Sequence, residues 1–223
     1  MPVAWFAAAL SAVLAQDARA VDRPAEPIRL VVMIAIDQMT PEQLTRLEPW
    51  LDGGLGRFAR KGLVFAEAAL QHGDTETAPG HTCYGTGLNP THNGIVSNDW
   101  YAIDAKESSY CYADSGVRTI SSAGVRAGGS SPRNNHAPGL VDFIKAAQPG
   151  SKAVAISSKD RSAIGMSGQH PDLALWWSQR SGGFQTSSWY VEQLPEWVST
   201  LNANWLARFD ATPFAKEWRG DLP

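Results

Sequence analysis

Short apolar runs alternate with amphipathic stretches along the chain. The first run, "RLVVMIAID" at residues 29–37, is rich in β-branched residues and ends in a carboxylate. Such a run is typical of a parallel strand buried on both faces. Thr40 then starts a helix, because Pro41 suits the first helical position and Gln43 completes a capping box with Thr40. The pattern therefore predicts a strand followed by a helix to about Trp50.

Four further segments follow before residue 140. "GLGRFARKG", residues 54–62, has a short helical pattern, and "LVFAEAAL", residues 63–70, predicts a second strand or a strand-like edge. The aromatic residues between positions 95 and 112 predict short strands or a hairpin around the turn "DAKE". Residues 121–139 are rich in Gly, Ser, Asn and Pro, and we expect an irregular connection there.

The second half of the pattern fixes the fold class. Residues 140–147 predict a helix, residues 153–157 a strand, and residues 194–209 a helix. Strands that alternate with helices favour an α/β sheet with helices on both faces. Six tryptophans fall in the last fifty residues, and the packing of loops and the last helix accounts for them better than a stacking platform for bases or sugars.

Composition excludes some classes of partner. The chain has 223 residues, 43% of them hydrophobic, which is enough to bury a core. Its 19 basic and 22 acidic residues give a net charge of -3. Because no basic cluster could follow a phosphate backbone, we expect no nucleic acid partner. An anionic substrate needs a local site.

The first twenty residues resemble a secretory signal peptide. An apolar run from Val3 to Ala15 is followed by small residues in cleavage-like patterns. A basic segment before the run is missing, so an N-terminal amphipathic or buried helix stays an alternative. The run is shorter than the roughly 20 residues that span a bilayer. We expect a periplasmic or secreted protein without a membrane attachment after cleavage.

An exported protein can form disulfides, so Cys83 and Cys111 are candidates for one bridge. Two small, half-buried cysteines are the equally good alternative. The sequence leaves both open.

The segment "TETAPGH" poses the central chemical question. Thr77 has the neighbours of a helix N-cap, and most threonines in this position are caps. A helix N-terminus also attracts anions, so a phosphoryl group at Thr77 would meet unpaired N–H groups and a positive dipole. The hydroxyl would need activation before it could attack phosphorus. Asp37 ends the first predicted strand, where open α/β sheets place ligands.

Three more residues could hold an anion. Asn98 has an amide that can donate to an oxyanion, although it lies among turn-forming residues. Lys159 and Arg161 follow the strand at 153–157, which places them at the same sheet edge as Asp37. Both cations suit phosphate oxygens. The alternative is a solvated loop in which Asp160 is their partner.

Taken together, these motifs resemble one family. The chain is similar to the alkaline phosphatase superfamily, in its type I phosphodiesterase and nucleotide pyrophosphatase branch, and most of all to exported bacterial alkaline phosphatases. The resemblance extends from about Ile28 to about Phe209. It is carried by "VVMIAIDQM", "TETAPGHTCYGTGLNPTHNGIVSNDWY", "SYCYADS", "SPRN", "AISSKDRSAI" and "WYVEQLPEWV".

The resemblance implies a function and a site. It makes Thr77 the nucleophile that becomes phosphorylated and Asp37 a ligand of the zinc that also binds the Thr77 oxygen. Asn98, Lys159 and Arg161 would hold the phosphoryl oxygens. Family members are two-zinc phosphomonoesterases that act on small phosphate esters.

The sequence also departs from the family. The family's other zinc ligands lie in an Asp-x-x-x-His pattern and an Asp-His pair, and neither occurs here. His81 has no metal role in the family. We therefore expect residues 28–223 to be the N-terminal part of the catalytic domain, with a partial sheet whose later strands are missing, and to be inactive by themselves. The alternatives are a nucleotide pyrophosphatase/phosphodiesterase and a non-catalytic periplasmic phosphate-binding module. Oligomeric state is open.

Overall fold

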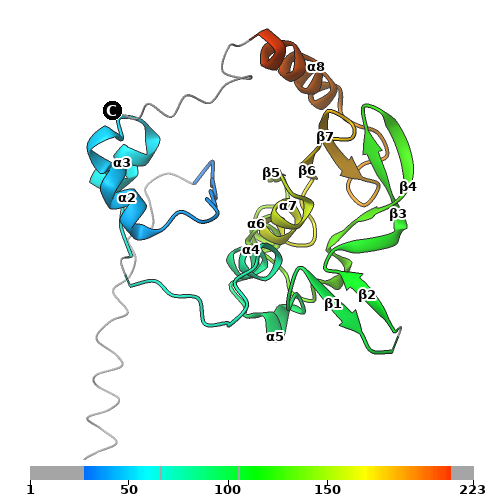
Figure 1. Cartoon of the computed structure of the whole chain (residues 1–223), viewed down its shortest axis with the longest axis horizontal. Coiled ribbons are helices and arrows are strands. Elements are labelled where there is room, and N and C mark those ends of the chain that lie inside the picture. The colour runs from blue at the N-terminus through cyan, green and yellow to red at the C-terminus, as the bar shows by residue number, and fades with distance from the viewer. Residues whose placement is uncertain (1–27, 66, 105, 212–223) are drawn as a thin grey trace, which may run out of the picture. The chain divides into compact units, whose positions relative to one another are not determined.

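The computed structural model describes residues 28–65, 67–104 and 106–211, and Figure 1 shows them in colour. The predicted signal peptide, residues 1–20, lies outside the described residues. The chain divides into two compact units, Met1–Ile36 and Asp37–Pro223. No described helix is both long and apolar enough to cross a membrane.

The predicted first strand is not formed. Residues 28–36 have no regular secondary structure, and their large side chains are exposed, for example Val32 at 65% and Ile34 at 65%. A strand needs a neighbouring strand to pair its N–H and C=O groups. The described part of this unit contains no such neighbour, so the prediction for residues 29–37 is wrong for this structure.

Local signals place the first helices of the second unit correctly. Helix α2 (Pro41–Leu47) continues into the 3₁₀ helix η1 (Glu48–Trp50), and α3 (Gly54–Lys61) follows. The capping box is present: the backbone N of Gln43 donates to Thr40 Oγ1 at 3.4 Å, and the backbone N of Thr40 donates to Gln43 Oε1 at 3.1 Å. The strand predicted at residues 63–70 is wrong, because the described residues there are exposed and unpaired.

Two sheets form the β structure of the described part of the second unit (Figure 1). Strands β1 and β2 make the predicted hairpin, and five strands make a mixed sheet in the order β4-β3-β7-β6-β5. Among its strand pairs only β5 and β6 are parallel. The bounds are β1 Asp99–Ala102, β2 Glu107–Tyr110, β3 Ala113–Ser121, β4 Gly124–Ser130, β5 Val154–Ser157, β6 Leu173–Ser178 and β7 Gly183–Ser187.

Strand β4 corrects the expectation of an irregular connection at residues 121–139. Its glycine-rich sequence pairs with β3 through a bulge, where Arg118 faces both Ala127 and Gly128. Gly128 has a φ of +73°, which a glycine adopts without strain. The two turn residues 122 and 123 and the last part of the segment, with the 3₁₀ helix η2 (Pro132–Asn134), lack strand structure.

Helices complete an α/β fold, as the sequence predicts. Helix α7 lies between the parallel strands β5 and β6 in the chain and packs on both, while α8 contacts β7. The bounds are α4 Thr77–Thr86, α5 Pro90–Asn93, α6 Leu140–Ala147, α7 Asp160–Ser167 and α8 Glu196–Ala211.

Helices α4 and α7 approach each other closely, and this contact positions the candidate site. A Cβ atom on Gly85 would lie 2.2 Å from the backbone oxygen of Gly165, so only glycine fits at the crossing. The core beside the crossing includes Ala78 of α4 and Ile164 of α7, both fully buried. The first turns of the two helices are thereby held in a fixed relation.

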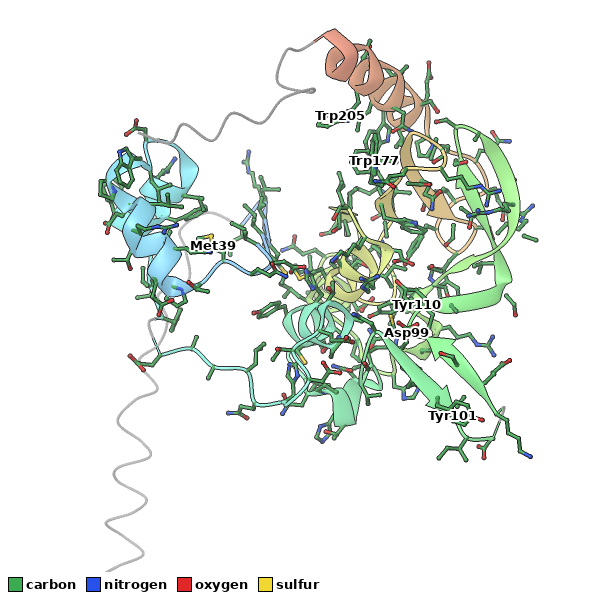
Figure 2. All side chains as sticks on the ribbon, in the orientation of Figure 1. Met39, Asp99, Tyr101, Tyr110, Trp177 and Trp205 are labelled. Carbon is green, nitrogen blue, oxygen red and sulfur yellow. The ribbon has the colours of Figure 1, made fainter. Side chains whose placement is uncertain are left out.

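The cysteines are free, and the late tryptophans pack only in part. Cys83 and Cys111 are both free thiols, so the disulfide is not formed in this structure. Trp177 makes edge-to-face contacts with Phe184 at 5.4 Å and Trp205 at 6.2 Å between ring centroids. Figure 2 shows Trp177 and Trp205 near each other. Trp189, Trp197 and Trp205 are nevertheless 43–49% exposed, so packing accounts for the described late tryptophans only in part.

Candidate active site

Thr77 is the first residue of α4 and not its cap. Glu76 occupies the N-cap position, and its side chain makes no capping hydrogen bond to the helix. The cap comes from a distant residue, because the backbone N of Ala78 donates to Asn98 Oδ1 at 2.9 Å. The expectation that Thr77 caps the helix is therefore wrong. Its hydroxyl lies at the start of the helix without that structural duty. The expected group of unpaired N–H donors is largely absent, because the backbone N of Gly80 donates to the Glu76 carbonyl oxygen at 3.0 Å and Pro79 has no N–H.

Glu76 fixes the segment that carries Asn98. Glu76 Oε2 accepts hydrogen bonds from Ser97 Oγ and from the backbone N of Asn98, both at 2.8 Å. Because Asn98 Oδ1 is used by Ala78, its Nδ2 is the end that can donate to a ligand. Sequence reasoning missed Glu76, since no pattern links residues that lie more than twenty positions apart.

Asp37 contacts α4 through the side chain of His81. Asp37 Oδ1 is 3.4 Å from His81 Nε2, with the Asp37 side chain 48% exposed and the His81 side chain 8% exposed. His81 Nδ1 is 2.8 Å from the carbonyl oxygen of Thr77. A carbonyl can only accept, so Nδ1 carries the proton. Asp37 follows a segment without strand structure, so its predicted place at a strand end is wrong.

Lys159 and Arg161 flank the start of α7, as expected from the end of β5. Lys159 is the exposed N-cap residue of this helix, and Arg161 is half-buried. Arg161 Nη1 lies 3.4 Å from the hydroxyl of Tyr110, and Arg161 Nε is buried without a hydrogen-bond partner among the described residues. A buried guanidinium N–H without an acceptor is costly, and an anion would satisfy it.

Backbone contacts link the two halves of the site. The carbonyl oxygen of Asn98 accepts from the backbone N of Cys111 at 2.9 Å, and Cys111 is adjacent to Tyr110, the partner of Arg161. Asn98 in turn contacts Ala78, the neighbour of Thr77. The structure thus connects the predicted residues of α4, the hairpin and α7 into one contiguous region. Lys159 belongs to it through its position in the chain.

The expected metal site needs more ligands than these. Among residues 28–65, 67–104 and 106–211, no group of three or more His, Cys, Asp or Glu side chains gathers in a way that could hold a metal ion. Zinc takes three or four protein ligands, so Asp37 and Thr77 do not make a zinc site by themselves.

The comparison with protein families decides where the chain belongs. The model of the type I phosphodiesterase / nucleotide pyrophosphatase family matches residues 31–196, which is more than half of the chain. The chain belongs to this family. Within the family it is 35% identical, over 190 residues, to alkaline phosphatase PafA of Elizabethkingia meningoseptica. That match covers 84% of the chain and 34% of the relative, so the chain spans about a third of the relative's length.

Solved structures agree with this family assignment. The crystal structure of wild-type alkaline phosphatase PafA matches with a TM-score of 0.69 and 32% identity over 77% of this chain and 32% of that chain. The fold is therefore alkaline-phosphatase-like. A second PafA structure, with a TM-score of 0.63 and 32% identity over 69% of this chain and 29% of that chain, is a variant with one threonine, one asparagine, one lysine and one arginine replaced.

Proposed function

We propose that the chain carries the nucleophile and the phosphoryl-binding residues of a phosphomonoester hydrolase of alkaline phosphatase type. The observation that carries the proposal is the buried Arg161 Nε without an acceptor, in a region that also holds Thr77 and Asn98. The PafA variant gives further support. Its four replaced residues are of the same types and order as Thr77, Asn98, Lys159 and Arg161, and the threonine–asparagine and lysine–arginine separations are the same.

The chemistry follows from the position of each group. The Thr77 hydroxyl loses its proton to water as Oγ1 attacks phosphorus, the bond from phosphorus to the ester oxygen breaks, and the leaving alkoxide takes a proton from water. The Thr77 backbone N–H, the Asn98 amide and the two cations stabilise the charge on the phosphoryl oxygens. Water then hydrolyses the phosphothreonine. Activation of the hydroxyl by two zinc ions, with Asp37 as a ligand, stays a prediction from the resemblance.

Charge favours a monoester over a diester as the substrate. A phosphate monoester at alkaline pH carries two negative charges and a diester carries one, and Lys159 and Arg161 supply two positive charges. At about 4 Å and an effective dielectric of 20, one charge pair interacts by roughly 4 kcal/mol before desolvation and screening reduce it. The family also includes phosphodiesterases by its description, so a nucleotide pyrophosphatase/phosphodiesterase is the second candidate.

The proposal also covers substrate and location. We expect a small-molecule phosphate ester and a periplasmic or secreted protein, on the basis of the predicted signal peptide. A non-catalytic phosphate-binding module would share the anion site but would form no phosphothreonine.

A titration with inorganic phosphate tests the anion site. Isothermal titration calorimetry of the 223-residue chain should show saturable binding that is much weaker, but still measurable, in Arg161→Ala and unchanged in Arg180→Ala, which removes an exposed arginine elsewhere. Equal affinities in all three proteins would contradict the proposal. Phenyl phosphate should bind at least about tenfold more tightly than methyl phenyl phosphate at pH 9, because the second charge is worth about 1.4 kcal/mol or more after screening. The reverse preference would favour the diesterase.

The role of Thr77 needs a complete catalytic domain. A chimaera that joins this chain to the part of PafA left out of the match provides one. In it, Thr77→Ala should abolish a phosphoenzyme trapped by acid quench, while Thr77→Ser should keep part of the activity because the oxygen remains. A phosphoryl group trapped on Thr75 instead would reassign the nucleophile.

A further inference from the structure

Asp160 is an acidic residue in an unexpected place, between the two cations proposed to bind phosphate. It is the first residue of α7 and is half-buried. Its Oδ1 accepts from Tyr110 Oη at 2.5 Å and from the backbone N of Arg161 at 2.8 Å, and its Oδ2 accepts from Ser130 Oγ at 2.6 Å. Both carboxylate oxygens are therefore occupied by neutral donors.

Tyr110 transmits this contact to Arg161. A tyrosine hydroxyl has one proton, and here it is donated to Asp160, so the hydroxyl oxygen can only accept from Arg161 Nη1 at 3.4 Å. Burial, and then the charge of Asp160, raise the pKa of Tyr110 well above its usual range. The hydroxyl therefore stays protonated and the direction of the two hydrogen bonds is fixed.

The arrangement keeps the Arg161 charge available. A carboxylate beside an arginine ordinarily forms a two-pronged ion pair with it and competes with a phosphate ligand. Among the described residues no ion pair of Arg161 with a carboxylate is found, and Arg161 Nε stays without a partner. The hydroxyls of Tyr110 and Ser130 occupy the Asp160 oxygens that would otherwise face the guanidinium.

The contacts join three separate elements at the site. Tyr110 ends β2, Ser130 ends β4, and Asp160 begins α7. Ser130 is itself held, because its carbonyl oxygen accepts from Ser187 Oγ of β7 at 2.7 Å. The place of Asp160 is thus set by the hairpin and by the large sheet together.

We infer that Asp160, held by Tyr110 and Ser130, is a positioning residue that fixes the Arg161 guanidinium for a phosphoryl group. The inference rests on the proposed function for its ligand, and its geometry can be tested without one. We call Tyr110, Ser130 and Asp160 the carboxylate clamp. Removing the Tyr110 hydroxyl should free the Arg161 side chain while the helix and sheet remain folded, since burial of the Tyr110 ring is kept in Tyr110→Phe.

Arginine side-chain NMR tests the clamp directly. In the wild-type chain the Arg161 Nε–Hε group should be as rigid as the backbone, whereas in Tyr110→Phe and in Ser130→Ala it should become as mobile as that of exposed Arg180. Tyr101→Phe is the matched control, because Tyr101 is 63% exposed and lies near the other end of the same hairpin (Figure 2). A rigid Arg161 in Tyr110→Phe, with unchanged backbone spectra, would overturn the inference.

Phosphate affinity then separates the inference from the proposed function. Tyr110→Phe should weaken binding of inorganic phosphate by about tenfold, because the Arg161 guanidinium would no longer be aligned for its charged hydrogen bond to phosphate. In an Arg161→Ala background the same change should have no further effect, because the clamp acts through Arg161. Equal losses in both backgrounds would contradict the positioning role. Absence of phosphate binding in the wild type would refute the proposed function, while the NMR result would still decide on the clamp.

Discussion

At the scale of residues, the side-chain amide of Asn98 serves the fold through its oxygen and the proposed site through its nitrogen. Its Oδ1 accepts from the first turn of α4, and its carbonyl oxygen holds Cys111 beside the hairpin. The Nδ2 group is the end left for a ligand. Loss of this side chain would therefore remove a helix cap and a ligand donor together, and a simple deletion could not tell the two roles apart.

The variants Asn98→Asp and Asn98→Ala separate these roles. Aspartate keeps an acceptor for the Ala78 N–H but places a negative charge where a phosphoryl oxygen would sit. We expect Asn98→Asp to retain the stability of the wild type and to lose phosphate binding, while Asn98→Ala loses both, with about 1 kcal/mol of destabilisation. Urea denaturation and calorimetry measure the two effects. Full phosphate affinity in Asn98→Asp would show that the amide is no ligand.

Sequence reasoning identified the site residues only in part. Thr77, Asn98 and Arg161 could be named because the motifs resemble a family, and the structure brings them into one region. Their roles stay predictions. The roles of Tyr110 and Ser130 could not be predicted. Tyr110 lies 50 residues and Ser130 lies 30 residues from Asp160 in the sequence, and no local pattern indicates contacts over such separations.

At the scale of elements, the close crossing of α4 and α7 depends on two glycines, which have no side chain. Gly85 lies against the backbone of Gly165, whose own missing Cβ would lie 3.0 Å from Thr82 Oγ1. Backbones can approach this closely only where both residues are small. The crossing holds the first turns of both helices, which carry Thr77 and Arg161.

Gly85→Ala should therefore separate the helices. Its methyl group would meet the Gly165 oxygen at 2.2 Å, and we expect a loss of about 1–3 kcal/mol in the free energy of unfolding. Gly80→Ala is the control on the same helix, because nothing lies within 4 Å of its Cβ position. It should be neutral or stabilising by up to about 1 kcal/mol. Thermal and urea unfolding distinguish the two, and equal effects would refute the close crossing.

Asp172 joins α6 to the start of β5 and β6. Its carboxylate accepts from the backbone N of Ala153 at 2.8 Å and from Lys145 and Lys152, each at 3.0 Å. Partial burial would raise the pKa of Asp172, but the Ala153 N–H and the two lysines outweigh it and lower the pKa to about 2. The charged form is therefore favoured by the folded state.

This lowered pKa makes stability depend on pH in a defined window. The stabilisation is present above about pH 4, the unfolded pKa, and is lost as the pH falls through about 2. Asp172→Asn should cost about 1–2 kcal/mol at pH 7, after allowance for solvent screening, and much less at pH 2. Urea denaturation across this range, with exposed Asp104→Asn as the control, measures it. A pH-independent difference would contradict the ion-pair explanation.

Element prediction succeeded where the signal is local. The capping box at Thr40, helix α6 and strand β5 have short-range patterns, and each forms where expected. The predictions for residues 29–37 and for β4 were wrong for one physical reason: a strand forms only where a neighbouring strand pairs with it. The apolar run has no described partner, whereas the glycine-rich β4 has β3.

At the scale of the whole molecule, the chain covers about a third of PafA's length. Among the described residues, no group of three or more His, Cys, Asp or Glu side chains could hold a metal ion. Since each zinc takes three or four protein ligands, we expect the 223-residue chain to retain fewer than two zinc ions. It should hydrolyse p-nitrophenyl phosphate no faster than Thr77→Ala. Plasma mass spectrometry after gel filtration and a rate assay would contradict this by finding two zinc ions and a Thr77-dependent rate.

The two free thiols differ in accessibility, so their rates of chemical modification report local opening near the candidate site. Cys111 is fully buried, burial raises the pKa of its thiol to about 12, and its N–H is bonded to Asn98, whereas Cys83 is only half-buried. Thiol reagents attack the thiolate, so they should modify Cys83 first and reach Cys111 only when the Asn98 segment opens. The labelling rate of Cys111 then measures how often this segment opens. Any ligand that keeps the segment closed should lower that rate.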